Sequence, residues 1–208
     1  MSGPLVKVCG MTRSVDVRAC RDLGVDLIGF IFHPKSPRCV EPSFAAGVPR
    51  GGPLKVGVFV DQSADEVNRI MDLAGLDLAQ LHGGQDAEFC RAVGPERVLK
   101  ALWPESLGSA RALEAEAARF AGCCRALLLD AGKSGGGHGR PMDFTILQHA
   151  DLKKDWFLAG GLGPETLSAA LAACSPSGLD CNSGVEDAPG IKNRNKIAAV
   201  LRLVGRNV

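Results

Sequence analysis

The sequence repeats one pattern eight times: a short apolar run with strand character, followed by a segment with helical spacing. Dividing the 208 residues by eight gives 26 residues per unit, about what one strand, one helix and two short connections need. We therefore expect eight strands, at residues 5–9, 26–32, 54–60, 76–81, 97–103, 125–130, 155–160 and 178–182.

Repeated strand–helix units imply parallel strands covered by helices, as either an open doubly wound sheet or a closed barrel. Eight units with no remainder favour the closed form. We predict an α/β fold, a small (β/α)8 TIM barrel formed as a single domain by residues 1–208. The segment 41–53 is rich in proline and glycine, so it leaves room for only a turn or two of helix. Helical spacing is clearest at residues 15–24, 64–75, 106–122, 164–174 and 194–204.

Composition and charge exclude several classes of protein. The 24 basic and 23 acidic side chains give a net charge of +1, so a surface for nucleic acid has no support. No apolar run approaches the roughly 20 residues of a membrane span. The first residues do not resemble a secretory signal. We expect a cytoplasmic protein without nucleic-acid or membrane partners.

The eight cysteines favour free thiols over a disulfide scaffold, because the chain is long enough to build its own core. None of them makes a CxxC pair or zinc-type spacing. His33 and His82 offer imidazoles that, with Cys9, suit zinc. They are scattered singly over different predicted loops, so hydrogen-bonded neutral histidines are the favoured interpretation. No metal and no cofactor are expected.

The informative residues are those at strand ends, since in a barrel the loops that follow the strands converge on one pocket. Cys9 ends the first strand, where a small buried core residue is the more frequent role of a cysteine. Asp130 ends the sixth strand after three leucines, and reaching a pocket or capping a turn are equally compatible with that position. Together the two residues offer a base and an acid that can move protons without a metal.

Two glycine-containing turns predict a phosphate site. One follows the seventh strand in LAGGLGPETL, and the other follows the eighth strand in CNSGVEDAPGIKN. In barrels these two loops frequently bind phosphate through backbone N–H groups. Ordinary left-handed turns remain the simpler interpretation of either loop alone.

Two further loops supply cations. Arg38, after the second strand, offers a guanidinium that pairs bidentately with a carboxylate, or that lies solvated at the surface. The glycine-rich stretch DAGKSGGGHGR lacks the spacing of a P-loop. A flap that closes Lys133, His138 and Arg140 over an anion is one interpretation, and a surface loop is the other.

Seven segments together resemble the phosphoribosylanthranilate isomerase family of tryptophan biosynthesis: VKVCGMTR, GFIFHPKSPRCV, VGVFVDQ, LAQLHGGQD, LLLDAGKSGGGHGRPMDF, FLAGGLGPETL and LDCNSGVEDAPGIKN. The resemblance runs from about residue 6 to the final helix. It implies a (β/α)8 barrel that converts N-(5′-phosphoribosyl)anthranilate to 1-(2-carboxyphenylamino)-1-deoxyribulose 5-phosphate by an Amadori rearrangement. The small phosphoribosyl substrate is the implied partner, and monomer and homodimer stay open.

The resemblance also assigns roles to residues. It implies that Cys9 is the general base and Asp130 the general acid, which would need a raised pKa to be protonated. Lys7 is expected to share the inner face of its strand with Cys9 and to favour the thiolate. His138, Arg140 and Cys181 depart from the family's usual residues. The implied substrate-binding residues are Arg38, His82, Gly160, Gly161, Leu162, Ser183 and Gly184.

Two alternatives stay open. The related isomerase of the histidine pathway shares the phosphate turns, but it resembles this chain less because it has aspartate where Cys9 stands. A non-catalytic phosphosugar-binding protein would keep the same loops without turnover.

Overall fold

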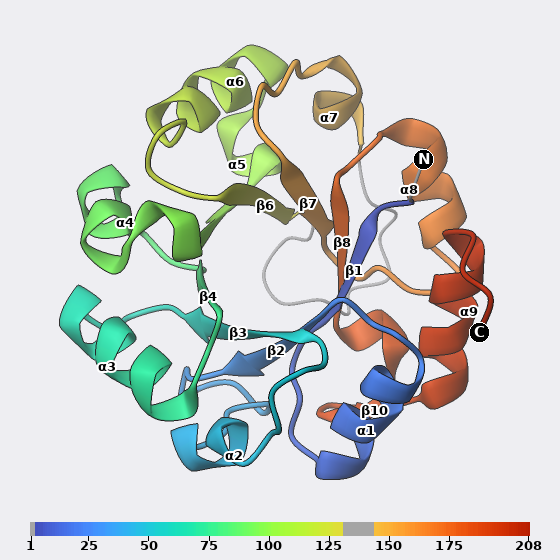
Figure 1. Cartoon of the computed structure of the whole chain (residues 1–208). Coiled ribbons are helices and arrows are strands. Elements are labelled where there is room, and N and C mark those ends of the chain that lie inside the picture. Colours follow the sequence, from blue (N-terminus) through green and yellow to red (C-terminus); the bar gives the residue numbers. More distant parts are fainter. Residues whose placement is uncertain (1–2, 131–143) are drawn as a thin grey trace.

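A computed structural model describes residues 3–130 and 144–208 of the chain, and in it eight parallel strands close into a barrel. Each strand pairs with the next, and β8 pairs with β1, so the predicted (β/α)8 barrel and its eight strands are confirmed (Figure 1). The barrel strands are β1 Leu5–Val8, β2 Leu27–Ile31, β3 Leu54–Phe59, β4 Leu78–Leu81, β5 Val98–Leu102, β6 Ala126–Asp130, β7 Trp156–Ala159 and β8 Gly178–Cys181.

Helices surround the barrel on its outside (Figure 1). As expected, the helix after β2 is short, with five residues. In the described part of the chain the α-helices are α1 Ser14–Asp22, α2 Pro42–Ala46, α3 Ala64–Ala74, α4 Ala87–Val93, α5 Pro104–Leu107, α6 Ala110–Arg119, α7 Thr145–His149, α8 Leu167–Ala173 and α9 Arg194–Leu203.

The expected helix over residues 106–122 is wrong in one respect, because the segment is divided between α5 and α6. Gly108 adopts a left-handed conformation with φ 74° and ends α5. The side chain of Ser109 then accepts a hydrogen bond from the backbone N–H of Ala112 and starts α6. A glycine followed by a capping residue therefore divides the segment into two helices, although its hydrophobic spacing alone predicts one.

Alternation along the strands separates two apolar layers. One set of side chains packs between the strands and the surrounding helices, as Phe30, Phe59 and Leu127 do. Side chains of the opposite parity fill the barrel itself, as in other barrels of this type. This inner cluster consists of Leu27, Val56, Leu78, Leu99, Ala101, Ala126, Leu128, Phe157 and Ala159.

A small hairpin after β8 was not predicted. Residues Ser183–Val185 form a 3-10 turn, and the strands β9 Glu186–Ala188 and β10 Ile191–Lys192 pair antiparallel beside it. Gly190, with φ 80°, allows the turn between them. The hairpin places Glu186 and Lys192 at the end of the barrel where Cys9 lies.

A further 3-10 turn, Pro95–Arg97, precedes β5. Among the residues described, no helix is long and apolar enough to cross a lipid bilayer.

Candidate active site

A cavity of about 450 Å³ opens at the carboxyl ends of the strands. Every strand or the loop after it contributes to its wall, as the fold requires. The cavity brings together seven of the predicted site residues: Cys9, Arg38, His82, Asp130, Gly160, Gly161 and Ser183.

Two predicted site residues do not line this cavity. Leu162 is fully buried, and Gly184 is half-buried against the backbone of Leu162. The predicted flap residues Lys133, His138 and Arg140 lie outside the described residues. A second cavity, of about 540 Å³, lies at the opposite end of the barrel and contains none of the predicted residues.

Cys9 follows β1 directly and points into the barrel. Its backbone N–H donates a 2.8 Å hydrogen bond to the carbonyl of Cys181, which ends β8. The thiol packs with Ile31 and Val58 and is 4% exposed. Gly29 on β2 leaves the space for it, since a Cβ at that position would lie only 2.6 Å from Sγ. The sulfur is therefore held in a defined place at the cavity wall.

A buried ion pair lies next to the thiol. Lys7 Nζ donates to both carboxylate oxygens of Asp180 at 2.9 Å, and Lys7 is fully buried. The two residues are neighbours across the β1–β8 pairing that closes the barrel. Lys7 thus shares the inner face with Cys9, as the alternation of its strand predicted.

The surroundings act on the thiol in opposite directions. Burial raises the pKa of Cys9, the Lys7 ammonium lowers it, the Asp180 carboxylate raises it, and Lys192 lowers it. The net result is a pKa above the ordinary value for a thiol. The expected thiolate is therefore not the resting form at neutral pH, because desolvation outweighs the two cations. Burial also lowers the pKa of Lys7, but Asp180 and Cys9 raise it more, so this side chain stays charged.

Asp130 ends β6 on another part of the wall and has His82 as a neighbour. The distance from His82 Nε2 to Asp130 Oδ2 is 3.6 Å. On its other side, His82 Nδ1 lies 3.1 Å from Nε2 of Gln80. Because the amide of Gln80 donates, we assign the proton of the imidazole to Nε2, facing Asp130. Burial lowers the pKa of His82 although Asp130 raises it, which leaves a neutral imidazole beside the carboxyl group.

The two glycine turns meet at the cavity. A Cβ at Gly184 would lie 2.2 Å from the carbonyl oxygen of Leu162, and one at Gly163 would lie 2.3 Å from that of Gly184. Only residues without side chains allow the two backbones to approach so closely. Thr166 closes the first turn, since its Oγ1 accepts from Gly163 N at 3.0 Å. The helix α8 begins at Leu167, three residues later than the expected start at Pro164.

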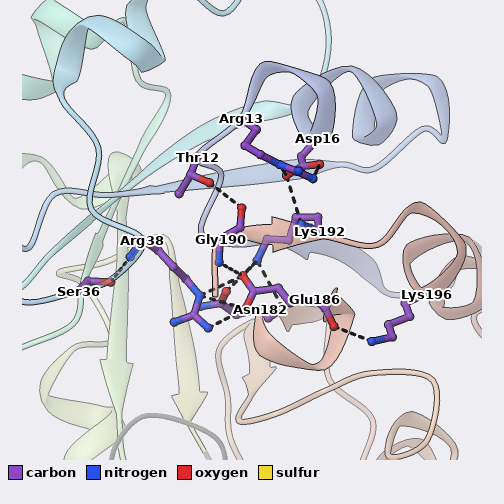
Figure 2. Close-up of polar contacts among 10 residues, drawn as sticks. All are labelled: Thr12, Arg13, Asp16, Ser36, Arg38, Asn182, Glu186, Gly190, Lys192 and Lys196. Atoms are coloured by element: carbon purple, nitrogen blue, oxygen red, sulfur yellow. Dashed lines mark hydrogen bonds and ion pairs between the residues drawn. The ribbon is translucent and has the colours of Figure 1, made fainter. Parts of the chain in front are cut away.

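Arg38 lines the cavity but already has a carboxylate partner. Its Nε lies 3.0 and 3.1 Å from the two oxygens of Glu186, and its Nη2 donates to Oε2 at 2.6 Å. Lys192 Nζ donates to the same carboxylate at 2.6 Å and to Asn182 Oδ1 at 2.8 Å. Figure 2 shows the two cations reaching Glu186 from the loop after β2 and from β10.

Asp180 and Lys192 were not predicted from the sequence, and Asn182 and Glu186, although they lie in the stretch after the last strand where site residues were expected, had no predicted role. Asp180 carries a signal, because it is a carboxylate at an inward position of a strand. The others lie in a loop and a hairpin, where no periodicity indicates which way a side chain points. Among residues 3–130 and 144–208, no group of three histidine, cysteine, aspartate or glutamate side chains could hold a metal ion.

Comparison with known proteins identifies relatives of the whole barrel. Residues 6–202 match the family model described as N-(5'phosphoribosyl)anthranilate (PRA) isomerase. A protein of Maridesulfovibrio salexigens named N-(5'-phosphoribosyl)anthranilate isomerase is 53% identical over 202 residues, covering 97% of this chain and 98% of that protein.

Solved structures agree with the sequence relatives. The crystal structure of phosphoribosyl anthranilate isomerase from Thermus thermophilus is 36% identical, with a TM-score of 0.78 and coverage of 95% of this chain and 96% of that one. A phosphoribosyl anthranilate isomerase in complex with reduced 1-(o-carboxyphenylamino)-1-deoxyribulose 5-phosphate is 29% identical, with a TM-score of 0.79 and coverage of 96% and 97%.

Proposed function

Because the chain belongs to the N-(5′-phosphoribosyl)anthranilate isomerase family, we propose that Cys9 and Asp130 are the catalytic base and acid of its reaction. The chain is an aldose–ketose isomerase of tryptophan biosynthesis. It converts N-(5′-phosphoribosyl)anthranilate to 1-(2-carboxyphenylamino)-1-deoxyribulose 5-phosphate. The observation that supports the two roles best is the placement of a thiol and a carboxyl group on the wall of one cavity, beside two phosphate turns.

In the first step the furanose ring opens. Protonated Asp130 donates its proton to the ring oxygen, while the electron pair of the anilino nitrogen expels the C1–O bond and forms an iminium ion. The neutral His82 beside Asp130 does not compete as an acid, because burial lowers the pKa of its imidazole. Its Nε2–H faces the carboxyl group at 3.6 Å, which is too long for a hydrogen bond.

In the second step the C2 proton moves. The iminium ion acidifies this proton, and the Cys9 thiolate removes it to give an enolamine, which tautomerises to the ketose. The thiol must first release its proton to solvent through the open cavity, and burial opposes that ionisation. The charges of Lys7 and Lys192 favour it, and the iminium ion adds a third positive charge only after the ring has opened. The thiolate is therefore most stable when the substrate is ready for proton abstraction.

We place the two anionic ends of the substrate at two separate parts of the wall. The phosphate binds the backbone of Gly160, Gly161 and Leu162 together with Ser183 and Gly184. The anthranilate carboxylate pairs with Arg38, which leaves the reacting carbons between Cys9 and Asp130. His82 contacts the substrate beside Asp130. Leu162 is buried, so its contribution comes from its backbone.

The test begins with phosphoribosylanthranilate made in situ from anthranilate and phosphoribosyl pyrophosphate by a separate transferase. Loss of the substrate's fluorescence is followed with the wild type, Cys9→Ala and Asp130→Asn. We expect turnover with the wild type and at least about a 100-fold lower kcat in each variant. Turnover that survives in Cys9→Ala would refute the assignment of the base. Binding without turnover in the folded wild type would instead support a binding protein.

We also propose the setting in which the enzyme works. All eight cysteines lie in the described residues and none forms a disulfide, which suits the reducing cytoplasm. The residues from 1 to 208 act as one domain whose partner is the small phosphoribosyl substrate. The enzyme works as a monomer or a homodimer, and sedimentation at working concentration distinguishes the two.

A further inference from the structure

We propose that Glu186 is a positioning residue, which holds one edge of the Arg38 guanidinium so that the other edge meets the carboxylate of the substrate. The inference rests on the proposed function, since it takes Arg38 as the group that binds that carboxylate. Glu186 itself touches no substrate. Its carboxylate lies 148 positions from Arg38 in the chain and joins the loop after β2 to the hairpin after β8.

The contacts of Arg38 divide its guanidinium into a used and an available side. Nε and Nη2 bind the two oxygens of Glu186. In the part of the chain that the structure describes, no hydrogen bond engages Nη1. Since a guanidinium has five N–H donors in a fixed plane, the end formed by Nη1 and Nη2 can still bind a second carboxylate. Arg38 lines the cavity and is 17% exposed, so this end is within reach of a ligand.

The stem of Arg38 is fixed from a second direction. Gly10, directly after Cys9, has a φ of 77° and lies under the side chain. A Cβ there would lie 2.7 Å from Arg38 Cδ and 2.8 Å from Asn182 Oδ1. The backbone at Gly10, beside the catalytic thiol, and the carboxylate of Glu186 therefore both fix the position of the Arg38 side chain. The position of a bound carboxylate is thereby defined relative to the thiol.

Glu186 is itself fixed by other residues, so its carboxylate does not move with the Arg38 side chain. It is 3% exposed, and its Oε1 accepts from Lys192 Nζ and, at 3.0 Å, from the backbone N–H of Gly190 (Figure 2). Burial raises the pKa of Glu186, but the hydrogen bonds of Arg38 and Lys192 lower it more, so the carboxylate is ionised. The cluster of Arg38, Glu186 and Lys192 carries a net charge of +1, which still attracts an anion.

The test measures how much the substrate carboxylate contributes to binding. Calorimetry gives the Kd of the product and that of 1-anilino-1-deoxyribulose 5-phosphate, which lacks only the carboxylate. The ratio of the two constants isolates this group, because loss of folded protein or of phosphate affinity changes both constants alike. In the wild type we expect the carboxylate to tighten binding at least about tenfold.

Three variants separate the possible roles. Arg38→Ala should reduce the ratio to about one. Glu186→Gln should reduce it at least about fivefold although Arg38 is intact, because an amide cannot hold two cations with ionic hydrogen bonds. Asp187→Asn is the matched control, since Asp187 is the adjacent carboxylate, is 55% exposed and binds Lys196 and Asn193 instead. Its ratio should equal that of the wild type.

Glu186→Gln leaves two buried cations without their anion and is at risk of not folding. A fourth variant, Glu186→Gln combined with Lys192→Met, removes one charge of each sign and keeps the net charge of the cluster at +1. A reduced ratio in this variant reflects lost positioning, since the net charge is unchanged. A wild-type ratio near one would overturn the role of Arg38 in the proposed function. A ratio that falls in Arg38→Ala but not in the Glu186 variants would overturn only the inference about Glu186.

Discussion

The space for the thiol of Cys9, the proposed catalytic base, depends on the absence of a side chain at Gly29 on β2. A Cβ at this position would lie 2.6 Å from Cys9 Sγ, 3.1 Å from its Cα and 3.3 Å from its Cβ. Carbon atoms in contact are about 3.5–4.0 Å apart, so Gly29→Ala must displace the sulfur by about 1 Å. The side chain has little freedom to relax, because Ile31 and Val58 pack against it.

The structure sets the size of the expected effect. A misplacement of about 1 Å at a reacting group costs about 100-fold in rate, and one extra methyl group in a packed interior costs about 1–3 kcal/mol of stability. We therefore expect Gly29→Ala to fold, to bind substrate with nearly the wild-type KM and to lose about 100-fold in kcat. KM changes little because Gly29 contacts neither of the proposed anion sites.

The measurement is the fluorescence assay for substrate loss, with urea unfolding run in parallel. Gly57→Ala is the matched control: its Cβ would lie 2.6 Å from Leu76 Cδ1 and 2.7 Å from the ring of Phe59, away from the thiol. It should lose similar stability and keep kcat within about threefold. If the two variants lost the same fraction of kcat, or if Gly29→Ala kept it, the position of Sγ would not limit the reaction.

Three further outcomes are expected. Arg38→Ala should raise KM by the equivalent of about 1.5–3 kcal/mol, the value of a charge-assisted hydrogen bond, and an unchanged KM would remove Arg38 from the site. Lys7→Met should shift iodoacetamide labelling of Cys9, followed by mass spectrometry, to higher pH. Lys7 lowers the thiol pKa, so its loss leaves less thiolate at any given pH, and an unchanged profile would contradict this account. Gly184→Ala should weaken competitive inhibition by inorganic phosphate about tenfold or more, because the added Cβ would lie 2.2 and 2.6 Å from backbone atoms of Leu162. An inhibition constant within about twofold of the wild type would exclude this turn from phosphate binding.

The barrel was predictable because each strand carries its own signal. A parallel strand buried on both faces is an apolar run, and eight such runs at regular spacing leave few possible folds. Helix boundaries depend on single residues, such as a glycine or a capping side chain, which can end a helix where the hydrophobic spacing alone predicts that it continues. Gly108 and Ser109 end one helix and start another within a segment whose apolar positions continue through both.

The residues of the candidate site could be predicted to lie together only where they end strands. Cys9 and Asp130 lie there, and the order of the strands brings them to one cavity. The partner of Arg38 was not predictable, since Glu186 belongs to a hairpin and reaches the arginine across 148 positions. The raised pKa of Cys9 was also missed, because burial and the charge of Asp180 become known only when the strands are placed in space.

The pairing of the first strand with the last has a consequence for biosynthesis. Lys7 emerges from the ribosome before its partner Asp180, which follows 173 residues later. The carbonyl of Cys181, which fixes the backbone of Cys9, arrives one residue after that. Until then the thiol has neither its neighbouring ion pair nor its place in the wall. The candidate site is therefore assembled only after the last barrel strand has been made, so a nascent chain without β8 carries an inactive cysteine rather than a partly working enzyme.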